Sequence, residues 1–159
     1  MEQNSDPKQE ILNFLQLDEF IGTGGQPTAQ QFNFLQEAAY RVVINLALPS
    51  SENALTNEGS LVTGLGMTYI HIPVVWEKPK MEDFNQFAQI MQALQGTKVF
   101  IHCARNMRVS CFMYLYRTIY QQVPHNIARR DLLQIWRPNE TWQAFIDAVH
   151  TSRIHLQGE

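Results

Sequence analysis

The sequence predicts one α/β domain with a mainly parallel central sheet flanked by helices. Short β-branched runs alternate along the chain with segments whose apolar residues recur at helical spacing, and parallel neighbours need such crossover helices. The 159 residues, of which 45% are hydrophobic and 17% charged, can bury one core. We therefore expect residues 1–159 to form a single domain, with residues 1–17 as an N-terminal helical extension.

In the first half of the chain, an apolar helical stripe at 11–15 precedes a strand that starts at Phe20 and stops at a glycine-rich turn over 22–25. Pro27 and Thr28 then open a helix, since proline suits the first helical turn. The run 41–46 is short, apolar and β-branched, which is typical of a strand covered on both faces. An irregular polar segment leads to a short helix before Gly64, and the next strand is expected at 67–75.

In the second half, apolar residues recur at helical spacing over 84–94 and Gly96 ends that helix. A strand at 98–102 follows, and the mostly apolar and aromatic run 109–120 indicates a helix buried on most sides. Two further helices are expected at about 126–136 and 139–149. Ligands collect at the carboxyl ends of parallel strands, so the segment after residue 102 is the expected site.

Composition excludes several functional classes. The net charge is −3 and the isoelectric point is about 5.9, so nucleic acid and anionic membranes are not expected partners. The polar N-terminal residues and the lack of a long apolar run predict a cytoplasmic protein without a leader or a membrane span. Cys103 and Cys111 are too few for a disulfide framework and are expected to be reduced thiols. Oligomeric state leaves no signal in the sequence.

The segment 102–110, His-Cys-Ala-Arg-Asn-Met-Arg-Val-Ser, lies between the expected strand and the buried helix. Unpaired N–H groups and the dipole at a helix start favour an anion, and they favour the thiolate of a cysteine placed there. Arg105 and Arg108 add two positive charges. A tight turn over 103–108 would hold the oxygens of a tetrahedral oxyanion, with Arg108 binding two of them. Cys103 is therefore the candidate nucleophile.

The other residues of this segment receive supporting roles. Ser110 would stabilise the thiolate as a leaving group, although it is also a plausible plain helix residue. Cys111 is expected in the core, and a zinc site is not expected because no fourth ligand accompanies the two cysteines and the histidine. No metal or other cofactor is predicted. The candidate substrate-binding residues are His102, which would orient the loop through hydrogen bonds, and Ala104, Arg105, Asn106, Met107 and Val109.

The strand, His-Cys pair, loop, arginine and helix resemble the signature of cysteine-dependent protein phosphatases. The usual form has five residues between Cys and Arg, whereas four separate Cys103 from Arg108, and Val109 stands at the usual arginine position. This spacing, with Gly-Gly-Gln-Pro-Thr at 24–28 and Val-Val-Ile-Asn-Leu at 42–46, resembles a bacterial dual-specificity-like phosphatase family also found fused to β-lactamase-like hydrolases. The resemblance covers about 20–117.

The resemblance implies a protein-tyrosine-phosphatase-like fold of the dual-specificity type. It also implies hydrolysis of a phosphomonoester, from a phosphorylated protein or a small phosphoester, through a phosphocysteine at Cys103 with Arg108 as the phosphate clamp. Such phosphatases keep their general acid on the segment after the preceding strand, which here is 76–79. Glu77 is the best candidate there, and an exposed Trp76 beside Cys103 would form an aromatic substrate wall.

Two other functions are compatible with the same segment. Rhodanese-like sulfurtransferases also place a cysteine at the end of a parallel strand, often with an arginine at the spacing seen here, and carry a persulfide on that cysteine. Asn106 stands where those loops commonly have glycine. The other alternative is a phosphate-binding module that performs no catalysis.

Overall fold

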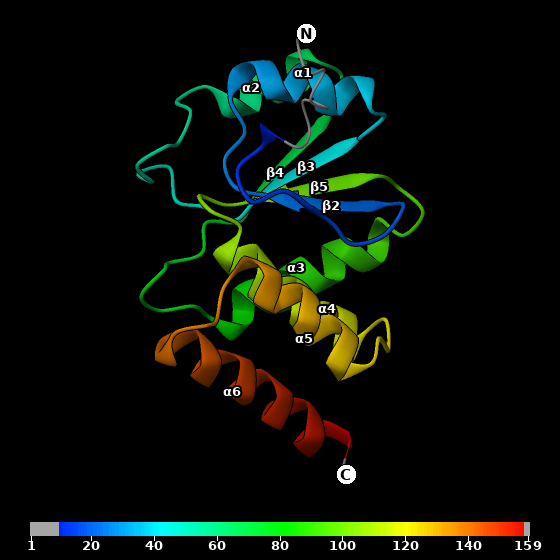
Figure 1. Ribbon diagram of the computed structural model, residues 1–159, viewed down its shortest axis with the longest axis vertical. Coiled ribbons are helices and arrows are strands. Elements are labelled where there is room, and N and C mark those ends of the chain that lie inside the picture. The colour runs from blue at the N-terminus through cyan, green and yellow to red at the C-terminus, as the bar shows by residue number, and fades with distance from the viewer. Residues whose placement is uncertain (1–9, 158–159) are drawn as a thin grey trace, which may run out of the picture.

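The computed structural model describes residues 10–157, and in this range a five-stranded sheet separates two layers of helices (Figure 1). Strand order is β1–β2–β5–β3–β4; the first pair is antiparallel and the other three pairs are parallel. The predicted mainly parallel α/β fold is therefore confirmed. The strands are β1 (Leu15–Gln16), β2 (Ile21–Gly24), β3 (Val42–Asn45), β4 (Thr68–His71) and β5 (Val99–His102).

Within the described range, two helices lie on one side of the sheet and four on the other, and the last of these packs on the helices and not on the sheet (Figure 1). The first two are α1 (Ala29–Glu37) and α2 (Glu58–Gly64). The four on the opposite face are α3 (Met81–Ala93), α4 (Met107–Ile119), α5 (His125–Ile135) and α6 (Glu140–Gln157). Each expected helix from residue 28 onward is present, and α6 extends beyond its expected end.

The central strands bury both of their faces, which explains their continuous apolar sequence. Val43 and Phe100 pack into the smaller core beneath α1 and α2, whereas Ile44 and Ile101 pack into the larger core against α3–α6. Successive side chains of a strand point to opposite faces. A strand covered on both sides must therefore be apolar at every position rather than at alternate ones.

Helix α4 forms the centre of the larger core, as its sequence predicts. Every residue from 108 to 117 is buried. The ring of Phe112 makes four aromatic contacts at centroid distances of 5.5–6.1 Å, with Phe84, Phe87, Trp142 and Phe145. These contacts join α4 to α3 and α6, so one side chain ties three helices together.

The helical extension expected over residues 1–17 differs from the observed structure where it can be compared. Residues 1–9 lie outside the described range. From residue 10 onward the chain makes a turn and then β1, which pairs Leu15 with Thr23. The Thr23 hydroxyl donates to the Leu15 carbonyl oxygen at 2.7 Å, and Ile11 is buried. Pairing with β2 therefore determines the conformation of Leu15 and Gln16, and the apolar pattern at 11–15 does not form the expected helix.

The glycine-rich segment after Phe20 is strand β2, not the predicted turn. A Cβ atom on Gly22 would overlap the Tyr40 hydroxyl, and one on Gly24 would lie 3.0 Å from the Phe100 ring. The glycines are therefore needed because neighbouring aromatic side chains pack directly on the strand backbone.

We predict that Phe112→Ala lowers the free energy of unfolding by about 3–5 kcal/mol, because it empties the contact between three helices. Urea denaturation followed by circular dichroism measures this change. Phe20→Ala is the matched control, since Phe20 is 40% exposed, and should cost about 1 kcal/mol or less. Equal losses in the two variants would contradict the central role of Phe112.

Candidate active site

The site lies where the parallel strands end. His102, the last residue of β5, is in register with Gly24 of β2 and Asn45 of β3, and Asn45 is in register with His71 of β4. The chain then passes through a loop at 103–106 into α4, so the helix N-terminus faces the end of β5. The partial positive charge of that N-terminus favours an anion at this point.

Three successive carbonyl groups of the loop are held by donors outside it. The carbonyl of a trans peptide points opposite to the N–H group of the next residue, so outward carbonyls turn the N–H groups of Ala104, Arg105 and Asn106 the other way. The bonds are Cys103 O with His102 Nδ1 at 3.2 Å, Ala104 O with Gln26 N and Asn53 Nδ2 at 3.1 Å each, and Arg105 O with Asn13 Nδ2 at 3.0 Å.

Asn106 makes the sharp change of direction from loop to helix. Its φ of 66° is left-handed, a conformation that asparagine adopts more readily than most residues. Its buried amide donates to the Asn13 carbonyl oxygen at 2.8 Å and to the Thr23 hydroxyl at 3.1 Å. Gly25 packs beneath the loop, where a Cβ would lie 2.8 Å from the Ala104 carbonyl oxygen. The β1–β2 region therefore supports the loop.

A cavity of about 250 Å³ opens over the loop and holds the expected nucleophile. It is lined by Trp76, Cys103, Ala104, Arg105, Met107 and Arg108. Cys103 is a free thiol and only 1% exposed as a residue. A neighbouring cleft of about 580 Å³ shares Ala104, Arg105 and Met107 with it and adds Leu12, Asn13, Glu52 and Asn53. Arg105 thus lies between the two hollows.

Arg108 is buried, and one of its hydrogen-bond donors has no partner among the described residues. The residue is 6% exposed, and its Nη1 donates to the Val74 carbonyl oxygen at 2.9 Å. Its guanidinium carbon lies 5.9 Å from the centre of the Trp76 ring. Its buried Nε has no hydrogen-bond partner among residues 10–157. Buried donors are rarely left unpaired, so this guanidinium is held in place with capacity for an acidic ligand.

The three tryptophans of the chain form one cluster beside the cavity. The Trp76 ring centre lies 5.3 Å from that of Trp136 and 5.8 Å from that of Trp142. Trp142 Nε1 donates to the Trp76 carbonyl oxygen at 3.0 Å. Trp76 is half-buried and lines the cavity beside Cys103, and the ends of α5 and α6 brace it. Its role as a wall for the substrate stays a prediction.

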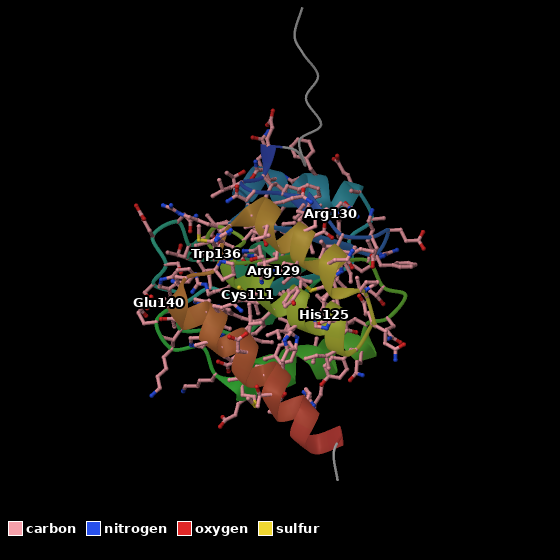
Figure 2. The ribbon with its side chains drawn as sticks, turned by 60° about the horizontal axis from the view of Figure 1, so that its bottom comes forward. Cys111, His125, Arg129, Arg130, Trp136 and Glu140 are labelled. Carbon is pink, nitrogen blue, oxygen red and sulfur yellow. The ribbon has the colours of Figure 1, made fainter. Side chains whose placement is uncertain are left out.

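Ser110 and Cys111 lie behind the cavity, against α5. The Ser110 hydroxyl donates to the Met107 carbonyl oxygen at 2.6 Å and accepts from Trp136 Nε1 at 2.9 Å, so it is engaged away from Cys103. Its role toward the thiolate stays a prediction. Burial raises the pKa of the Cys111 thiol to about 12, which fits the core role expected for it. Figure 2 labels Cys111 and Trp136 in this region.

The remaining predicted residues divide between the cavity and its surroundings. Ala104, Arg105 and Met107 line the cavity, whereas the side chains of His102, Asn106 and Val109 are buried outside its lining. Glu77 is exposed on the turn after β4, next to Trp76, and is absent from the cavity lining. Its role as general acid stays a prediction.

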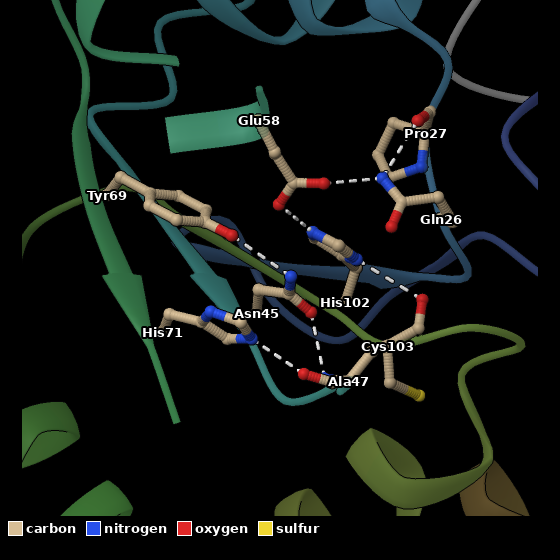
Figure 3. A network of polar contacts seen from close by, with 9 residues as sticks. All are labelled: Gln26, Pro27, Asn45, Ala47, Glu58, Tyr69, His71, His102 and Cys103. Atoms are coloured by element: carbon tan, nitrogen blue, oxygen red, sulfur yellow. Dashed lines mark hydrogen bonds and ion pairs between the residues drawn. The ribbon is translucent and has the colours of Figure 1, made fainter. Parts of the chain in front are cut away.

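A buried polar network behind the loop escaped the sequence analysis (Figure 3). Glu58, on α2, is 4% exposed; its Oε2 lies 2.8 Å from His102 Nε2, and its Oε1 accepts from Gln26 Nε2 at 2.5 Å. Burial alone would raise the pKa of Glu58, but His102, Gln26 and Tyr69 outweigh it and lower the pKa. A single acid in a polar segment gave no signal of this pairing.

Neither a metal site nor a membrane-spanning helix is found in the described part of the chain. No three His, Cys, Asp or Glu side chains there are grouped so that they could hold a metal ion. None of the helices between residues 10 and 157 combines the length and the apolar character needed to cross a bilayer.

Comparisons with known proteins place this geometry in context. A family model described as DSP-PTPase phosphatase fused to NAD+ kinase matches residues 5–145. No curated protein gives a significant match. A solved structure of a DUF442 protein from Shewanella putrefaciens CN-32, described as a candidate phosphatase, is 37% identical, with a TM-score of 0.84 over 92% of this chain and 97% of that chain.

More distant structures share the fold alone. P. aeruginosa TpbA is 16% identical, with a TM-score of 0.71 over 92% of this chain and 91% of its own. The core catalytic domain of the PP-IP phosphatase SIW14 from S. cerevisiae is 18% identical, with a TM-score of 0.71 over 86% of this chain and 85% of its own.

We predict that Arg108→Lys weakens sulfate binding at least about tenfold, because lysine cannot replace a fixed, two-pronged donor. Isothermal titration calorimetry with sodium sulfate measures the affinity. Arg41→Lys is the control: this exposed arginine lies at the amino end of β3, whereas the site lies at the carboxyl ends of the strands, and its variant should bind as the parent does. Unchanged binding in Arg108→Lys would remove Arg108 from the anion site.

Proposed function

The chain belongs to the family of DSP-PTPase phosphatases fused to NAD+ kinase, and we propose that it hydrolyses phosphomonoesters through a phosphocysteine on Cys103. The family and the fold support a phosphatase of the protein-tyrosine-phosphatase-like class. One observation carries the finer proposal. The buried Nε of Arg108 has no partner among the described residues, and its side chain lines the same cavity as the free thiol of Cys103.

In the first step, the phosphoryl group of the substrate occupies the cavity above Cys103. Loop N–H groups and the Arg108 guanidinium donate to its non-bridging oxygens and stabilise the charge that develops on them. The thiolate attacks phosphorus, a sulfur–phosphorus bond forms, and the bond from phosphorus to the leaving oxygen breaks with its electron pair. The leaving oxygen takes a proton and departs as an alcohol or phenol.

In the second step, water attacks phosphorus and the sulfur–phosphorus bond breaks. The sulfur leaves as the thiolate, the water gives its proton to the carboxylate left when the leaving oxygen was protonated in the first step, and inorganic phosphate is released. The dipole of α4 and the fixed loop stabilise the thiolate in both steps. Positioning and charge stabilisation by these groups supply the catalysis, and no step requires a metal.

Glu77 is proposed as the acid that protonates the leaving oxygen. Its turn includes Trp76, which lines the cavity, so Glu77 is the acidic residue adjacent in sequence to the cavity wall. The substrate is proposed to be a phosphorylated protein or a small phosphoester. Trp76 forms one wall for the organic group that carries the phosphate. A larger organic group could also extend past Arg105 into the neighbouring cleft.

We predict that the protein releases phosphate from p-nitrophenyl phosphate and that Cys103→Ser abolishes this release, because serine is not ionised and cannot attack phosphorus at a useful rate. Absorbance of p-nitrophenolate measures the rate. Cys111→Ser is the matched control, since this thiol lies in the core behind the cavity, and the folded variant should retain activity.

The same preparations distinguish the other functions. Thiocyanate formed from thiosulfate and cyanide, and lost in Cys103→Ser, would identify a sulfurtransferase and overturn the proposal. Sulfate or phosphate binding without turnover in either assay would indicate a binding module.

We predict that Glu77→Gln lowers kcat about 100-fold for a phosphate ester with a poor leaving group, such as phenyl phosphate. The loss should be much smaller for p-nitrophenyl phosphate, whose leaving group needs less protonation. Steady-state rates for the two esters measure the contrast. Glu52→Gln removes an exposed carboxylate from the neighbouring cleft and serves for comparison; if only that variant shows the contrast, Glu52 is the acid.

A further inference from the structure

His102 is surrounded by hydrogen-bond acceptors at both ring nitrogens. Nε2 lies 2.8 Å from Glu58 Oε2, and Nδ1 lies 3.2 Å from the carbonyl oxygen of Cys103 (Figure 3). A carbonyl oxygen only accepts, so Nδ1 must carry a proton. A neutral ring has one protonated nitrogen, which would leave Nε2 bare toward the carboxyl group.

The proton between Nε2 and Glu58 therefore decides the charge of the ring. The other carboxyl oxygen, Oε1, already accepts from the Gln26 amide, so the proton belongs either to Nε2 or to Oε2. The same contacts, with a smaller contribution from Tyr69, lower the pKa of Glu58 despite its burial. Both placements keep the contacts of Nδ1, Nε2 and Oε1, and the lowered pKa of Glu58 favours the carboxylate facing a doubly protonated ring.

We propose that Glu58 is a positioning residue that keeps His102 as an imidazolium, which fixes the Cys103 carbonyl and places positive charge directly behind the nucleophile. This inference rests on the proposed function for Cys103. Glu58 touches neither the cavity nor the reacting atoms, so it acts through His102 alone. Because the ring contacts Cys103 directly through its carbonyl oxygen, whereas Glu58 contacts only the other nitrogen of the ring, the pair as a whole favours the thiolate.

The surroundings strengthen this effect. The groups that face the pair are Gln26, Tyr69 of β4 and the loop itself, while Phe32 and Phe100 place their rings 6.1 Å from the His102 ring. His71, the other histidine at this edge, contacts the Ala47 carbonyl oxygen instead. His102 is fully buried, and charges interact more strongly where water is excluded.

A purely structural role explains the pair less well. Moving two charges out of water is costly, and apolar side chains of similar volume often stabilise a core equally well. The pair occupies the end of β5, directly before the proposed nucleophile. Unlike an apolar pair, a charged pair at this position can donate a hydrogen bond to the Cys103 carbonyl oxygen and place charge beside the loop.

Glu58→Gln tests the proposal with little change of shape, because a glutamine amide can donate to a bare Nε2 of a neutral ring. The readout is alkylation of Cys103 by iodoacetamide between about pH 5 and 9, quantified by mass spectrometry of the Cys103 peptide. We expect alkylation at about pH 6 to be about tenfold slower, and the pH profile to move upward by about one unit. The exposed Glu37 supplies the control, Glu37→Gln, whose profile should match the parent.

An unchanged profile in folded Glu58→Gln would overturn the inference, and so would a profile moved to lower pH, which would mean that the carboxylate repels the thiolate directly. Alkylation needs no phosphatase activity, so the two proposals fail separately. A parent protein that hydrolyses no phosphate ester, combined with a moved profile, would remove only the proposed function. An active parent with an unmoved profile would remove only the role of Glu58.

A measurement on the unaltered protein covers the case in which Glu58→Gln does not fold. Nitrogen chemical shifts of His102 in protein labelled with ¹⁵N-histidine report directly on protonation of Nδ1 and Nε2. We expect two protonated nitrogens near pH 7. One protonated and one bare nitrogen would overturn the inference.

Discussion

The outward direction of three loop carbonyl groups is the constraint on which the site depends. A tight loop between a strand and a helix can present either its oxygens or its N–H groups to a ligand, and only the N–H groups suit an oxyanion. Donors from three separate parts of the chain, Asn13, Gln26 and Asn53, together with His102, hold the oxygens away from the cavity. The geometry of the loop therefore depends on several segments that meet at the carboxyl ends of the strands, and not on the loop sequence alone.

The fold could be predicted where the signal is local. Strands β3 and β5 and helix α4 are buried on most sides, so each has an apolar sequence of its own that indicates its type. Strand β1 could not be predicted because its two residues are extended only through pairing with β2. Gly22 similarly resembles a turn residue, and only the Tyr40 side chain packed against it explains its place in a strand.

The candidate site shows the same division. Cys103 and Arg108 are five positions apart, so the strand–loop–helix pattern brings them to one cavity. Glu58 and Asn13 are 44 and 92 positions from their partners His102 and Arg105, and only the tertiary fold places them together. The candidate nucleophile and anion-binding arginine could be predicted from the sequence. The residues that position the loop around them could not, because they depend on tertiary contacts that leave no sequence pattern.

The gathering of all three tryptophans at one wall of the cavity has a practical consequence. Trp76 contacts the guanidinium of Arg108, and Trp136 and Trp142 contact Trp76. Tryptophan emission from this protein therefore originates in one cluster that includes a wall of the cavity, rather than being averaged over the molecule. Intrinsic fluorescence is thus a built-in optical reporter of events at that wall, and it needs no attached dye.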